Sequence, residues 1–477
     1  MDLASYLIFS RFIQGFSLGV HIIFASLGIG LPIIIVISEI LGRKDKYFLL
    51  LAKKLIKPFI VLFAIGTASG IIVALELFVL WPNFMALVGQ VAILPFYVEV
   101  FAFFAESIFI GVYFYSLKNL GKISHIISGL IIAIGASLSG ALITMINAFM
   151  NTPTGFNIQA YLTKGIITDV NPLSAFNTPS TFVEISHVLP SSFLVAVSIV
   201  LIYVIFSLFR STSEESKIFY NKALRLLLVL GFIGILLTGI SGINSITSLA
   251  NTQPEKYAAL EANYAPSSNA SEIIFGIPEI TENGSLVVKD ALVIPRLQSF
   301  LLGGTAPGLK EFNATTFPPS LYPSLYQNVS AYLYNDASWP PLFVHDTFDF
   351  MALGGFVIFI VFLIAFLFLL FEARNLHIRF INKFFSLNSK FLLYLIIFVS
   401  ILSIITLELG WVTAEVGRQP WIIYDVMTVN QGAGYSSFTE VFSIIIVLFY
   451  SSIIPLTYFL IKKVSPKESI ENEMKEL

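Results

Sequence analysis

Residues 350–372 read FMALGGFVIFIVFLIAFLFLLFE, and the one charged side chain among them is the last, Glu372. A helix of about 20 such residues rises roughly 30 Å, which is the thickness of the hydrocarbon core of a bilayer. The chain contains further blocks of this kind on both sides. The full set of blocks is 16–40, 58–81, 93–116, 125–149, 188–209, 225–247, 350–372, 390–411 and 440–461. The sequence therefore predicts an all-α integral membrane protein with nine transmembrane helices.

The composition of the 477 residues supports the same class. Apolar residues make up 56% and charged residues only 12%, whereas soluble domains carry about a quarter charged residues. The net charge of −2 argues against nucleic acid as a partner. The absence of cysteine excludes disulfides and iron–sulfur clusters and leaves His, Met and carboxylates as metal ligands. The first apolar block is too long for a cleavable signal peptide.

The positions of Lys and Arg predict the orientation of the chain. Most of them follow predicted spans one, three, five and seven or lie in the C-terminal tail, and basic residues concentrate in cytoplasmic loops. We therefore expect the N terminus outside and the C terminus inside. The expected segments are transmembrane helices 1–6 in 1–247, an external loop in 248–349, transmembrane helices 7–9 in 350–461 and a cytoplasmic tail in 462–477.

The external loop is longer than ordinary connections, and such loops are usually functional or disordered. Its prolines, aromatic residues and short apolar runs favour a folded cap. It contains Asn-x-Ser/Thr sequons, which make N-glycosylation a hypothesis. These sequons begin at Asn269, Asn283, Asn313 and Asn328.

Five residues able to bind metal fall near the outer ends of the predicted spans. His21 lies in the outer third of the first span, and His187 opens the fifth. Glu99 lies early in the third span, Met351 at the outer end of the seventh, and Glu415 just after the eighth. Ionisable groups at this depth are expensive and usually functional, and these residue types can ligate haem iron. The alternative to haem ligation is an ordinary apolar methionine and a hydrogen-bonded interfacial histidine.

The remaining histidines fall at predicted membrane boundaries. They are His125 and His377 on the inner side and His345 on the outer side. Because the interfacial region accommodates a ring with a polar edge, we interpret all three as interfacial side chains.

Glu99 and Glu106 stand seven residues apart on one predicted helix. At about 100° and about 1.5 Å per residue, they share a face and lie roughly 10 Å apart. Two stacked acids suit a proton relay, with Glu106 nearer the cytoplasm. The alternative is a pair of neutral acids that hydrogen-bond to neighbouring helices.

Several motifs resemble those of a known family. The most specific is GRQPW at 417–421, which follows Gly410-Trp411 and Ala414-Glu415. Other segments agree with the family in order and spacing. They are Ser10-Arg11 with His21, Trp81 with Glu99, AFFAES at 102–107, NAFMNTP at 147–153, KYAALEA at 256–262 and FGIP at 275–278. Over nearly its whole length the chain resembles subunit I of cytochrome bd-type quinol oxidases, as a divergent branch.

The resemblance implies a donor side near the outer surface. His187 and Met351 would be the axial ligands of a low-spin haem b. Lys256 and Glu261 match the positions that interact with quinol under the external loop.

The resemblance also implies an oxygen-reducing side. His21 and Glu415 would serve two high-spin haems, with Glu99 close enough to be a further iron ligand. Arg418 would pair with a haem propionate, a role that suits an always-charged fork, and Trp411 belongs to the same cofactor-binding segment. Glu106 and Ser107 would lie on a cytoplasmic proton path that ends near Glu99.

The implied activity is oxidation of quinol outside and reduction of O2 to water with protons from the cytoplasm, which builds a proton gradient without pumping. The implied cofactors are a low-spin haem b and two high-spin haems, either b and d or b alone. The implied partners are a second related multi-span subunit, small accessory subunits and the membrane quinone pool. The implied location is the plasma membrane of a prokaryote.

This sequence departs from the family pattern at three points. Asp349 stands where the family normally has Arg, and Glu184 stands where Lys is common, so two propionate partners of the low-spin haem are missing. The segment from Glu99 to Glu106 is also one residue shorter than usual. These changes favour haem b over the chlorin d at the oxygen site.

Other functions stay open on the sequence. A haem- and quinol-binding subunit without oxygen reductase activity would carry the same ligands. A proton-coupled secondary transporter would also need intramembrane acids, although the halves show no inverted repeat and no paired broken helices. A membrane enzyme that acts on lipids or glycans is a further alternative. Haem content separates the haem proteins from the other classes, and O2 consumption separates the oxidase from the electron-transfer subunit.

Overall fold

The computed structural model describes residues 3–116, 121–263, 267–280, 286–306, 340–341, 343–374, 389–434, 438–464, 469–475 and 477. Within these residues nine helices are long and apolar enough to cross a membrane. They are α1 (Leu3–Gly42), α2 (Lys46–Leu80), α4 (Leu94–Tyr115), α5 (Lys122–Asn151), α8 (Thr181–Arg210), α9 (Glu214–Thr252), α13 (Val344–Ala373), α15 (Lys390–Val416) and α17 (Phe438–Val464). Each predicted block coincides with one of these helices to within a residue or lies inside it, so the predicted nine-helix class is confirmed.

Several helices continue well past the apolar blocks that predicted them. α1 is 40 residues long and α9 is 39, which at about 1.5 Å per residue exceeds the roughly 30 Å hydrocarbon core. Their polar ends therefore project beyond the apolar layer. As one consequence, Glu415 lies in the last turn of α15 rather than after it.

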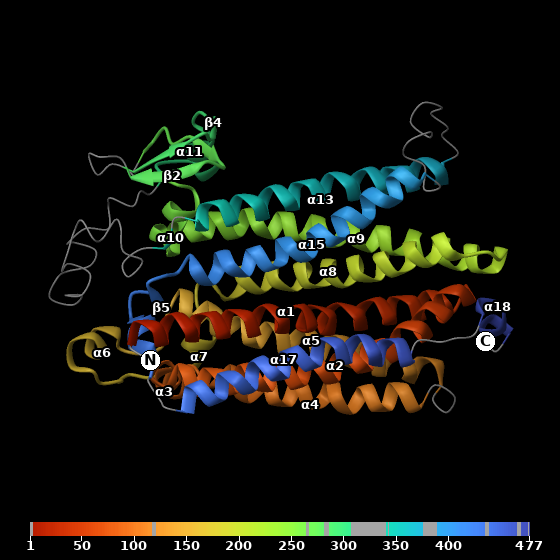
Figure 1. The fold of residues 1–477 in the computed structure, drawn as a ribbon, viewed down its shortest axis with the longest axis horizontal. Coiled ribbons are helices and arrows are strands. Elements are labelled where there is room, and N and C mark those ends of the chain that lie inside the picture. The colour runs from red at the N-terminus through yellow and green to blue at the C-terminus, as the bar shows by residue number, and fades with distance from the viewer. Residues whose placement is uncertain are drawn as a thin grey trace.

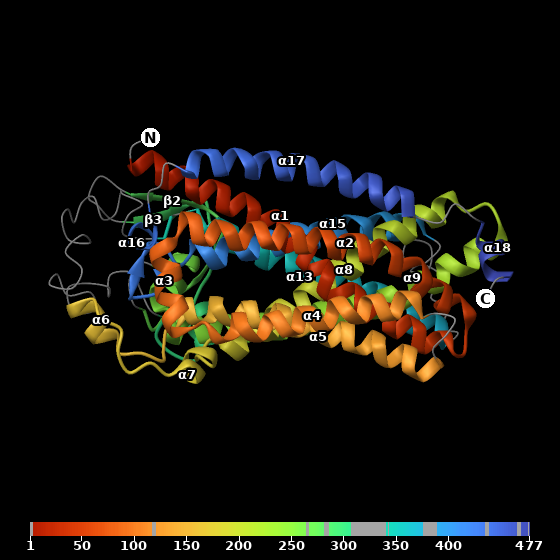
Figure 2. The same cartoon turned by 90° about the horizontal axis from the view of Figure 1, so that it is seen from below.

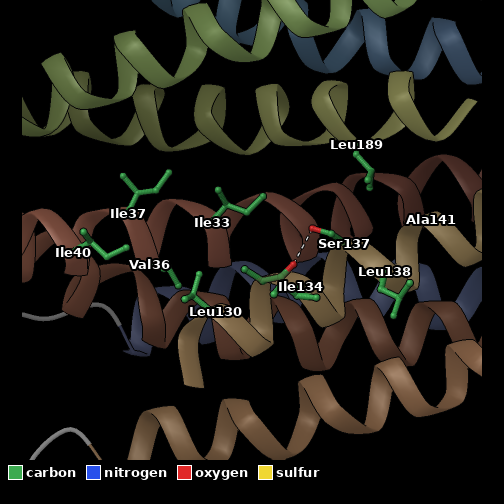
Figure 3. Close-up of a pocket in the computed structure, with 11 residues that line it drawn as sticks. Ile33, Val36, Ile37, Ile40, Leu130, Ile134, Ser137, Leu138, Ala141 and Leu189 are labelled. Carbon is green, nitrogen blue, oxygen red and sulfur yellow. Dashed lines mark hydrogen bonds between the residues drawn. The ribbon is translucent and has the colours of Figure 1, made fainter. Parts of the chain in front are cut away.

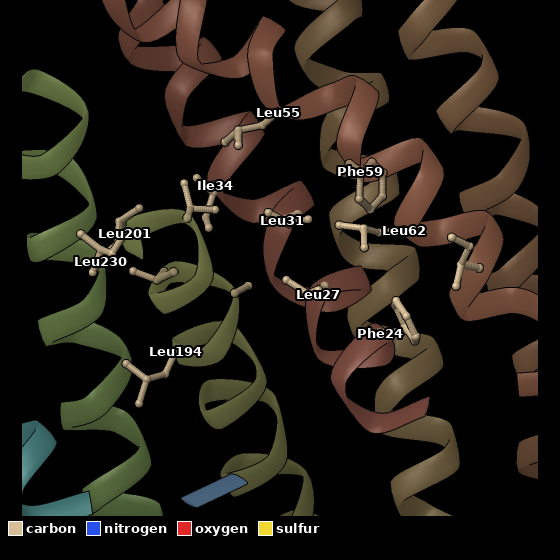
Figure 4. Packing of buried hydrophobic residues seen from close by; sticks show 14 of the residues in the cluster. Phe24, Leu27, Leu31, Ile34, Leu55, Phe59, Leu62, Leu194, Leu201 and Leu230 are labelled. Carbon is tan, nitrogen blue, oxygen red and sulfur yellow. The ribbon is translucent and has the colours of Figure 1, made fainter. Parts of the chain in front are cut away.

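The long helices lie roughly parallel to one another and form a single bundle (Figure 1). α8, α9, α13 and α15 pack together on one side, and α1, α2, α4 and α5 on the other. α17 packs against α2 and α1 on the outside of the bundle (Figure 2). α1 joins the two groups because it contacts both α2 and α8. Its buried Leu27, Leu31 and Ile34 face Phe59 of α2 on one side and Leu201 of α8 on the other (Figure 4).

Glycines allow the central helices to approach closely, as small residues do in membrane bundles. A Cβ at Gly30 of α1 would lie 2.3 Å from the Cβ of Ala196 in α8. A Cβ at Gly231 of α9 would lie 2.1 Å from the ring of Phe362 in α13. Neither position has room for a side chain.

Short elements gather at the end of the bundle that holds the N terminus (Figures 1 and 2). The helices among them are α3 (Pro82–Val91), α6 (Ile158–Lys164), α7 (Pro172–Phe176), α10 (Pro254–Leu260), α11 (Leu297–Leu302) and α16 (Val429–Gly432). The strands are β1 (Glu272–Ile274), β2 (Ile277–Ile280), β3 (Leu286–Lys289), β4 (Leu292–Ile294), β5 (Trp421–Ile423) and β6 (Met427–Thr428). They form three antiparallel pairs, β1 with β4, β2 with β3, and β5 with β6.

The two strand pairs of the long loop are attached to the start of α13 through Phe275. Phe275, between β1 and β2, has a φ of 55°, which is uncommon for a residue with a side chain. Its N–H donates to Asp349 Oδ2 over 2.5 Å, and its ring lies 4.8 Å from that of Phe350. The next residue, Gly276, has a φ of 121°, and a Cβ there would lie 2.4 Å from Val288. These contacts hold the loop over α13.

The opposite end of the bundle carries basic residues and ion pairs. Lys222 pairs with Asp45, and Arg225 Nη2 lies 2.7 Å from Glu372 Oε1. The C-terminal helix α18 (Ile470–Lys475) lies at this end (Figure 1), where the nearly buried Lys54 Nζ lies 2.5 Å from Glu473 Oε2. The basic residues thus gather at the end that we expect to face the cytoplasm, while the side of the membrane stays a prediction.

Some expectations from the sequence fall outside the described residues. Among the sequons, Asn269 is described and exposed. Asn283, Asn313, Asn328 and His377 lie outside the described residues.

A groove of about 490 Å³ lies between α1, α5 and α8. Its lining is apolar apart from Ser137, whose hydroxyl donates to the Ala133 carbonyl of its own helix (Figure 3). A surface of this chemistry suits hydrocarbon chains and offers no group for proton or electron transfer.

The close contact of α1 and α8 gives a stability prediction. Gly30→Ala should destabilise the detergent-solubilised protein by about 1–3 kcal/mol, because the added methyl group overlaps Ala196. The measurement is the midpoint of thermal unfolding by fluorescence-detected size exclusion. Gly28→Ala is the control, since nothing lies within 4 Å of a Cβ there. The double change Gly30→Ala/Ala196→Gly should recover stability. Equal stability of Gly30→Ala and the parent would contradict the close approach.

Candidate functional site

His21 is held on α1 by a serine of α2. His21 Nδ1 lies 2.9 Å from Ser69 Oγ, and the same hydroxyl donates to the Gly66 carbonyl over 2.8 Å. A serine hydroxyl has one proton to give, so Nδ1 must be the donor in the contact between them. His21 is therefore the tautomer with its lone pair on Nε2, which is the form that binds a metal through that nitrogen.

His187 repeats this arrangement between α8 and α9. Its Nδ1 lies 3.1 Å from Ser241 Oγ, and Ser241 donates to the Thr238 carbonyl over 3.0 Å. The same reasoning leaves the lone pair on Nε2. Two histidines far apart in sequence are thus oriented by the same device, a pattern usual for metal-ligating histidines.

The three proposed ligands His21, His187 and Met351 each lie against a glycine of a neighbouring helix. A Cβ at Gly70 would lie 3.0 Å from His21 Cε1, and one at Gly242 would lie 3.4 Å from His187 Cε1. A Cβ at Gly410 would lie 3.2 Å from the sulfur of Met351. Larger residues at these positions would crowd the three side chains.

A buried polar network joins α5, α8 and α15. Arg418 is 2% exposed; its Nη2 lies 2.7 Å from Glu415 Oε2, and its Nη1 donates to Asn151 Oδ1 over 2.7 Å. Asn151 donates to Glu184 Oε1 over 2.7 Å, and Asn147 donates to the other oxygen of Glu415. Arg418 Nε is buried without a hydrogen-bond partner. That free donor fits the anionic propionate that the resemblance implies.

Glu184 belongs to this network. It stands where a Lys was expected, and it lies within electrostatic range of Lys256 and Arg418. Both cations are therefore already partly neutralised by Glu184. Asp349, the second departure, points to the loop instead, where it binds the Phe275 N–H.

Lys256 connects the long loop to the network. It lies on α10, is 5% exposed, and its Nζ donates to the Ala414 carbonyl over 2.7 Å. Burial, followed by the charge of Arg418, lowers the pKa of Lys256 to about 8. Glu261, at the end of α10, is also buried and accepts from Gln298 Nε2 over 3.2 Å. Lys256 thus lies on this short helix and Glu261 directly follows it, but the two residues have different partners.

Glu99 and Glu106 face α5 together. Ser139 donates to Glu99 Oε1 over 2.7 Å, and Glu106 packs against Gly135, four residues earlier on α5. Glu106 is 4% exposed. The predicted common face is therefore observed. Ser107 donates to the Phe103 carbonyl of its own helix over 2.8 Å.

The remaining predicted residue, Trp411, lies half-buried on α15 four residues before Glu415. His345 and His125, which were predicted to lie at membrane boundaries, are buried within the protein, at 1% and 5% exposed. The reason is a partner for each ring. His345 Nδ1 lies 2.6 Å from the Leu260 carbonyl, and His125 Nδ1 lies 2.6 Å from Glu39 Oε1.

The acids inside the spans that the sequence reasoning missed include Glu39, the partner of His125, as well as Glu76 and Glu408. Glu76 of α2 is fully buried and accepts from Ser17, four residues before His21 on α1, over 2.5 Å. Glu408 of α15 reaches α1, because a Cβ at Gly19 would lie 3.3 Å from its Oε2. Glu76 and Glu408 each keep one buried oxygen without a hydrogen-bond partner. The signal in the sequence that could have identified these acids was a charged residue within an apolar block.

The fold and the site together define a class. The chain is a multi-pass helical membrane protein whose buried His, Met, Arg and carboxylate side chains suit a haem-binding electron-transfer protein. Comparison with known proteins specifies the family. The model of the cytochrome bd terminal oxidase subunit I family matches residues 9–469, and the chain belongs to that family.

Individual relatives agree with this assignment. The chain is 33% identical over 453 residues to a Bacillus subtilis (strain 168) protein that is described, provisionally, as a cytochrome bd menaquinol oxidase subunit I. The matched region covers 92% of this chain and 94% of the relative. It is 27% identical to cytochrome bd ubiquinol oxidase subunit 1 of the same organism, over 86% of this chain and 82% of that one. The structure of bd oxidase from Geobacillus thermodenitrificans has 30% sequence identity and a TM-score of 0.79, and covers 97% of this chain and 100% of the other.

Family membership carries a coarse statement about function. The chain is a multi-pass membrane subunit of the terminal quinol oxidase class, which uses haem cofactors and works with a second subunit. The roles of individual residues stay proposals.

The serine contacts give a prediction about the histidines. With His187 as a proposed haem ligand, Ser241→Ala should lower the haem content, because removal of such a supporting hydrogen bond costs about 10- to 100-fold in metal affinity. Pyridine haemochrome quantitation and the reduced-minus-oxidised spectrum measure the loss. Ser245→Ala is the matched control, because Ser245 lies one turn away and donates only to its own helix at Ser241. Normal haem content in both variants would show that Ser241 does not orient a ligand.

Proposed function

We propose that this chain is the haem-bearing subunit of a quinol:O2 oxidoreductase that oxidises quinol on the outer side of the membrane and reduces O2 to water with cytoplasmic protons. Separation of the two proton reactions across the membrane would build a proton gradient without a pump. The end of the bundle with the N terminus, α10 and the hairpins would face outward. The end with the basic residues would face the cytoplasm.

One contact carries this proposal. Lys256 of the loop donates to the Ala414 carbonyl, and the next residue of α15 is Glu415, the partner of Arg418. The residue expected to meet quinol is therefore attached to the segment expected to hold a haem. An electron donor bound at Lys256 would lie beside its acceptor, which suits quinol oxidation better than solute transport.

The residues divide into two groups around the haems. His187 and Met351 would hold the low-spin haem b, with Nε2 of His187 already free of its own proton. His21, Glu415 and Glu99 would serve the high-spin haems, with Arg418 offering its free Nε to a propionate. The bound haems would supply electron transfer and oxygen chemistry. Pigment analysis would determine whether the haem at the oxygen site is b or d.

The stacked acids of α4 would move protons toward the oxygen site. Glu106 is buried against Gly135, and Glu99 is hydrogen-bonded to Ser139, so both acids face the α4–α5 contact. Ser107 would belong to this route only if its hydroxyl rotated away from the Phe103 carbonyl, which accepts its hydrogen bond.

The remaining parts of the proposal concern the surroundings of the chain. The plasma membrane of a prokaryote would contain it, together with a second related multi-span subunit and small accessory subunits. Its relatives are named for menaquinol and for ubiquinol, so both quinols belong in the assay. Segment 248–349 would be the extracytoplasmic quinol-binding loop, with 1–247 and 350–461 supplying the membrane helices and 462–477 the cytoplasmic tail.

Replacement of Lys256 tests the donor site. Lys256→Gln should raise the KM for quinol about tenfold, which corresponds to roughly 1.4 kcal/mol of lost binding. The purified oxidase is assayed by quinol-dependent O2 consumption. Lys164→Gln, an exposed lysine at the same end, should leave the KM unchanged. Unchanged KM values in both variants would remove the loop as the quinol site, and haem reduction without O2 consumption in the parent would identify an electron-transfer subunit instead.

Replacement of Glu106 tests the proton route. Glu106→Gln should slow O2 reduction by about 100-fold, since Gln cannot give or take a proton, and proton-transfer groups typically contribute about 10²–10⁴-fold. Haem content and spectrum should stay normal, and Glu106→Asp should recover part of the rate. Glu214→Gln, which changes an exposed acid near the inner end, is the control. Normal turnover of Glu106→Gln would contradict the relay.

A further inference from the structure

Three buried polar side chains meet where α1 and α4 end and α5 begins. They are Glu39 of α1, Tyr113 of α4 and His125 of α5, which are 8%, 2% and 5% exposed. α4 and α5 lie side by side (Figure 2), and α1 packs against α5. His125 stands in the first turn of α5, which begins at the exposed Lys122. The cluster therefore lies close to the end of the bundle that carries the basic residues.

The three side chains of this cluster are hydrogen-bonded to one another. The Tyr113 hydroxyl donates to Glu39 Oε2 over 2.7 Å, and His125 Nδ1 lies 2.6 Å from Glu39 Oε1. His125 Nε2 lies 3.0 Å from the Tyr113 carbonyl oxygen. The centroids of the Tyr113 and His125 rings are 4.0 Å apart. Both oxygens of the carboxyl group and both nitrogens of the imidazole are thus engaged.

The two oxygens that face His125 determine where its protons lie. A carbonyl oxygen can only accept, so Nε2 carries a hydrogen. The contact between Nδ1 and Glu39 Oε1 then needs one further proton, which belongs either to the imidazolium or to the neutral carboxylic acid. In both forms the Glu39–His125 pair holds one proton that can pass between two groups. The geometry of the hydrogen bonds therefore makes the pair a proton store.

The pair also links three helix ends, but that task does not require titratable groups. Replacement of a buried ion pair by packed apolar residues is often neutral or stabilising. Apolar packing is available at this place, since a Cβ at Gly129 would lie 2.8 Å from Val36 and 3.0 Å from the Tyr113 ring. A transferable proton is the property that apolar residues could not provide here.

The cluster continues the row of acids on α4. Glu99, Glu106 and Tyr113 follow one another at intervals of seven residues, which place them on one face of the helix at steps of roughly 10 Å. Their neighbours on α5, taken in the same order, are Ser139, Gly135 and Gly129. The row therefore runs along the contact of α4 with α5, from the cluster to Glu99.

The tilt of the side chains favours transfer toward Glu106. Side chains on a helix lean toward its N terminus. α4 ends at the cluster, whereas α5 begins there. Tyr113 therefore leans back along α4 toward Glu106, and His125 leans away from Glu106 toward the end of the bundle.

We infer that Glu39, His125 and Tyr113 form the site at which protons enter the route to Glu106. The inference rests on the proposed reduction of O2 with cytoplasmic protons. Glu39 gives the stored proton to the oxygen of the Tyr113 hydroxyl, and the hydroxyl releases its own proton through a bound water molecule to the carboxylate of Glu106. Tyr113 is a neutral phenol before and after this step. A proton from cytoplasmic water then enters through His125 and restores the shared proton of the pair.

The test uses the purified oxidase with its partner subunit and three variants that change the chemistry of the cluster but little of its shape. Glu39→Gln keeps an oxygen that can accept from Tyr113 but removes the acid. His125→Asn keeps a donor for Glu39 but cannot exchange a proton, and Tyr113→Phe removes the hydroxyl alone. One control is Ser128→Ala, a buried serine that donates to a carbonyl of its own helix. The other is Tyr115→Phe, an exposed tyrosine at the same end of α4.

The readouts are quinol-dependent O2 consumption in H2O and in D2O, and anaerobic reduction of the haem by quinol. We expect Glu39→Gln and His125→Asn to slow O2 consumption by about tenfold. Tyr113→Phe should slow it less, since water can replace a hydroxyl more readily than an acid. The solvent isotope effect should exceed that of the parent, because proton entry then limits the rate. Haem content and anaerobic reduction should stay unchanged, and both controls should behave as the parent.

A double variant tests whether the cluster and Glu106 belong to one route. Glu39→Gln/Glu106→Gln should turn over no more slowly than the slower of the two single variants, because steps in series share one limit. Losses that multiply in the double variant would show independent roles and would overturn the inference.

The other outcomes also have separate meanings. Parent-like O2 consumption in all three variants would overturn the entry site while leaving quinol oxidation in place. Loss of haem from the variants would overturn it as well, because it would assign the cluster to the fold. Normal turnover of Glu106→Gln alone would instead remove the proposed relay. Absence of quinol-dependent O2 consumption in the parent would remove the proposed function, and the inference with it.

Discussion

The buried guanidinium of Arg418 is the charge around which the polar part of this protein is arranged. An unpaired charge at 2% exposure would cost several kcal/mol, so its neighbours must supply anions and acceptors. Glu415 does so from the preceding turn of α15, and Asn151 does so from α5. Asn151 in turn holds Glu184 of α8. Three helices are thus positioned by one side chain. The remaining donor, Nε, has no hydrogen-bond partner and is available to a further anion.

The same requirement explains why two unusual acids are tolerated. Glu184 would be a costly charge in a bilayer, but it lies within range of both Arg418 and Lys256. Asp349 instead accepts the Phe275 N–H and lies 3.6 Å from His345 Nε2. One acid belongs to the network around Arg418 and the other contacts the loop. The two departures from the family pattern therefore have different structural consequences, although both replace a basic residue.

The sequence predicted the spans well because the length of an apolar block is a local property set by the thickness of the bilayer. It did not predict the hairpins of the loop, since strands of three or four residues are too short for their periodicity to stand out. The ligand set came from family resemblance, and the structure adds why His21 and His187 suit it, through Ser69 and Ser241. Those contacts join different helices, which no single segment of sequence shows. Glu76 and Glu408 were visible as charges within apolar blocks, whereas the hydrogen bond from Phe275 to Asp349 depends on how the loop folds back.

The loop and the helices that carry the ligands behave as one unit for a geometric reason. α10 is fastened at Lys256 to Ala414, one residue before Glu415, and at Leu260 to His345. The hairpins are fastened through Phe275 to Asp349, two residues before Met351. Each attachment thus lies within about two turns of a proposed iron ligand on α13 or α15. The proposed donor site and the proposed iron ligands are therefore held together by the same few contacts.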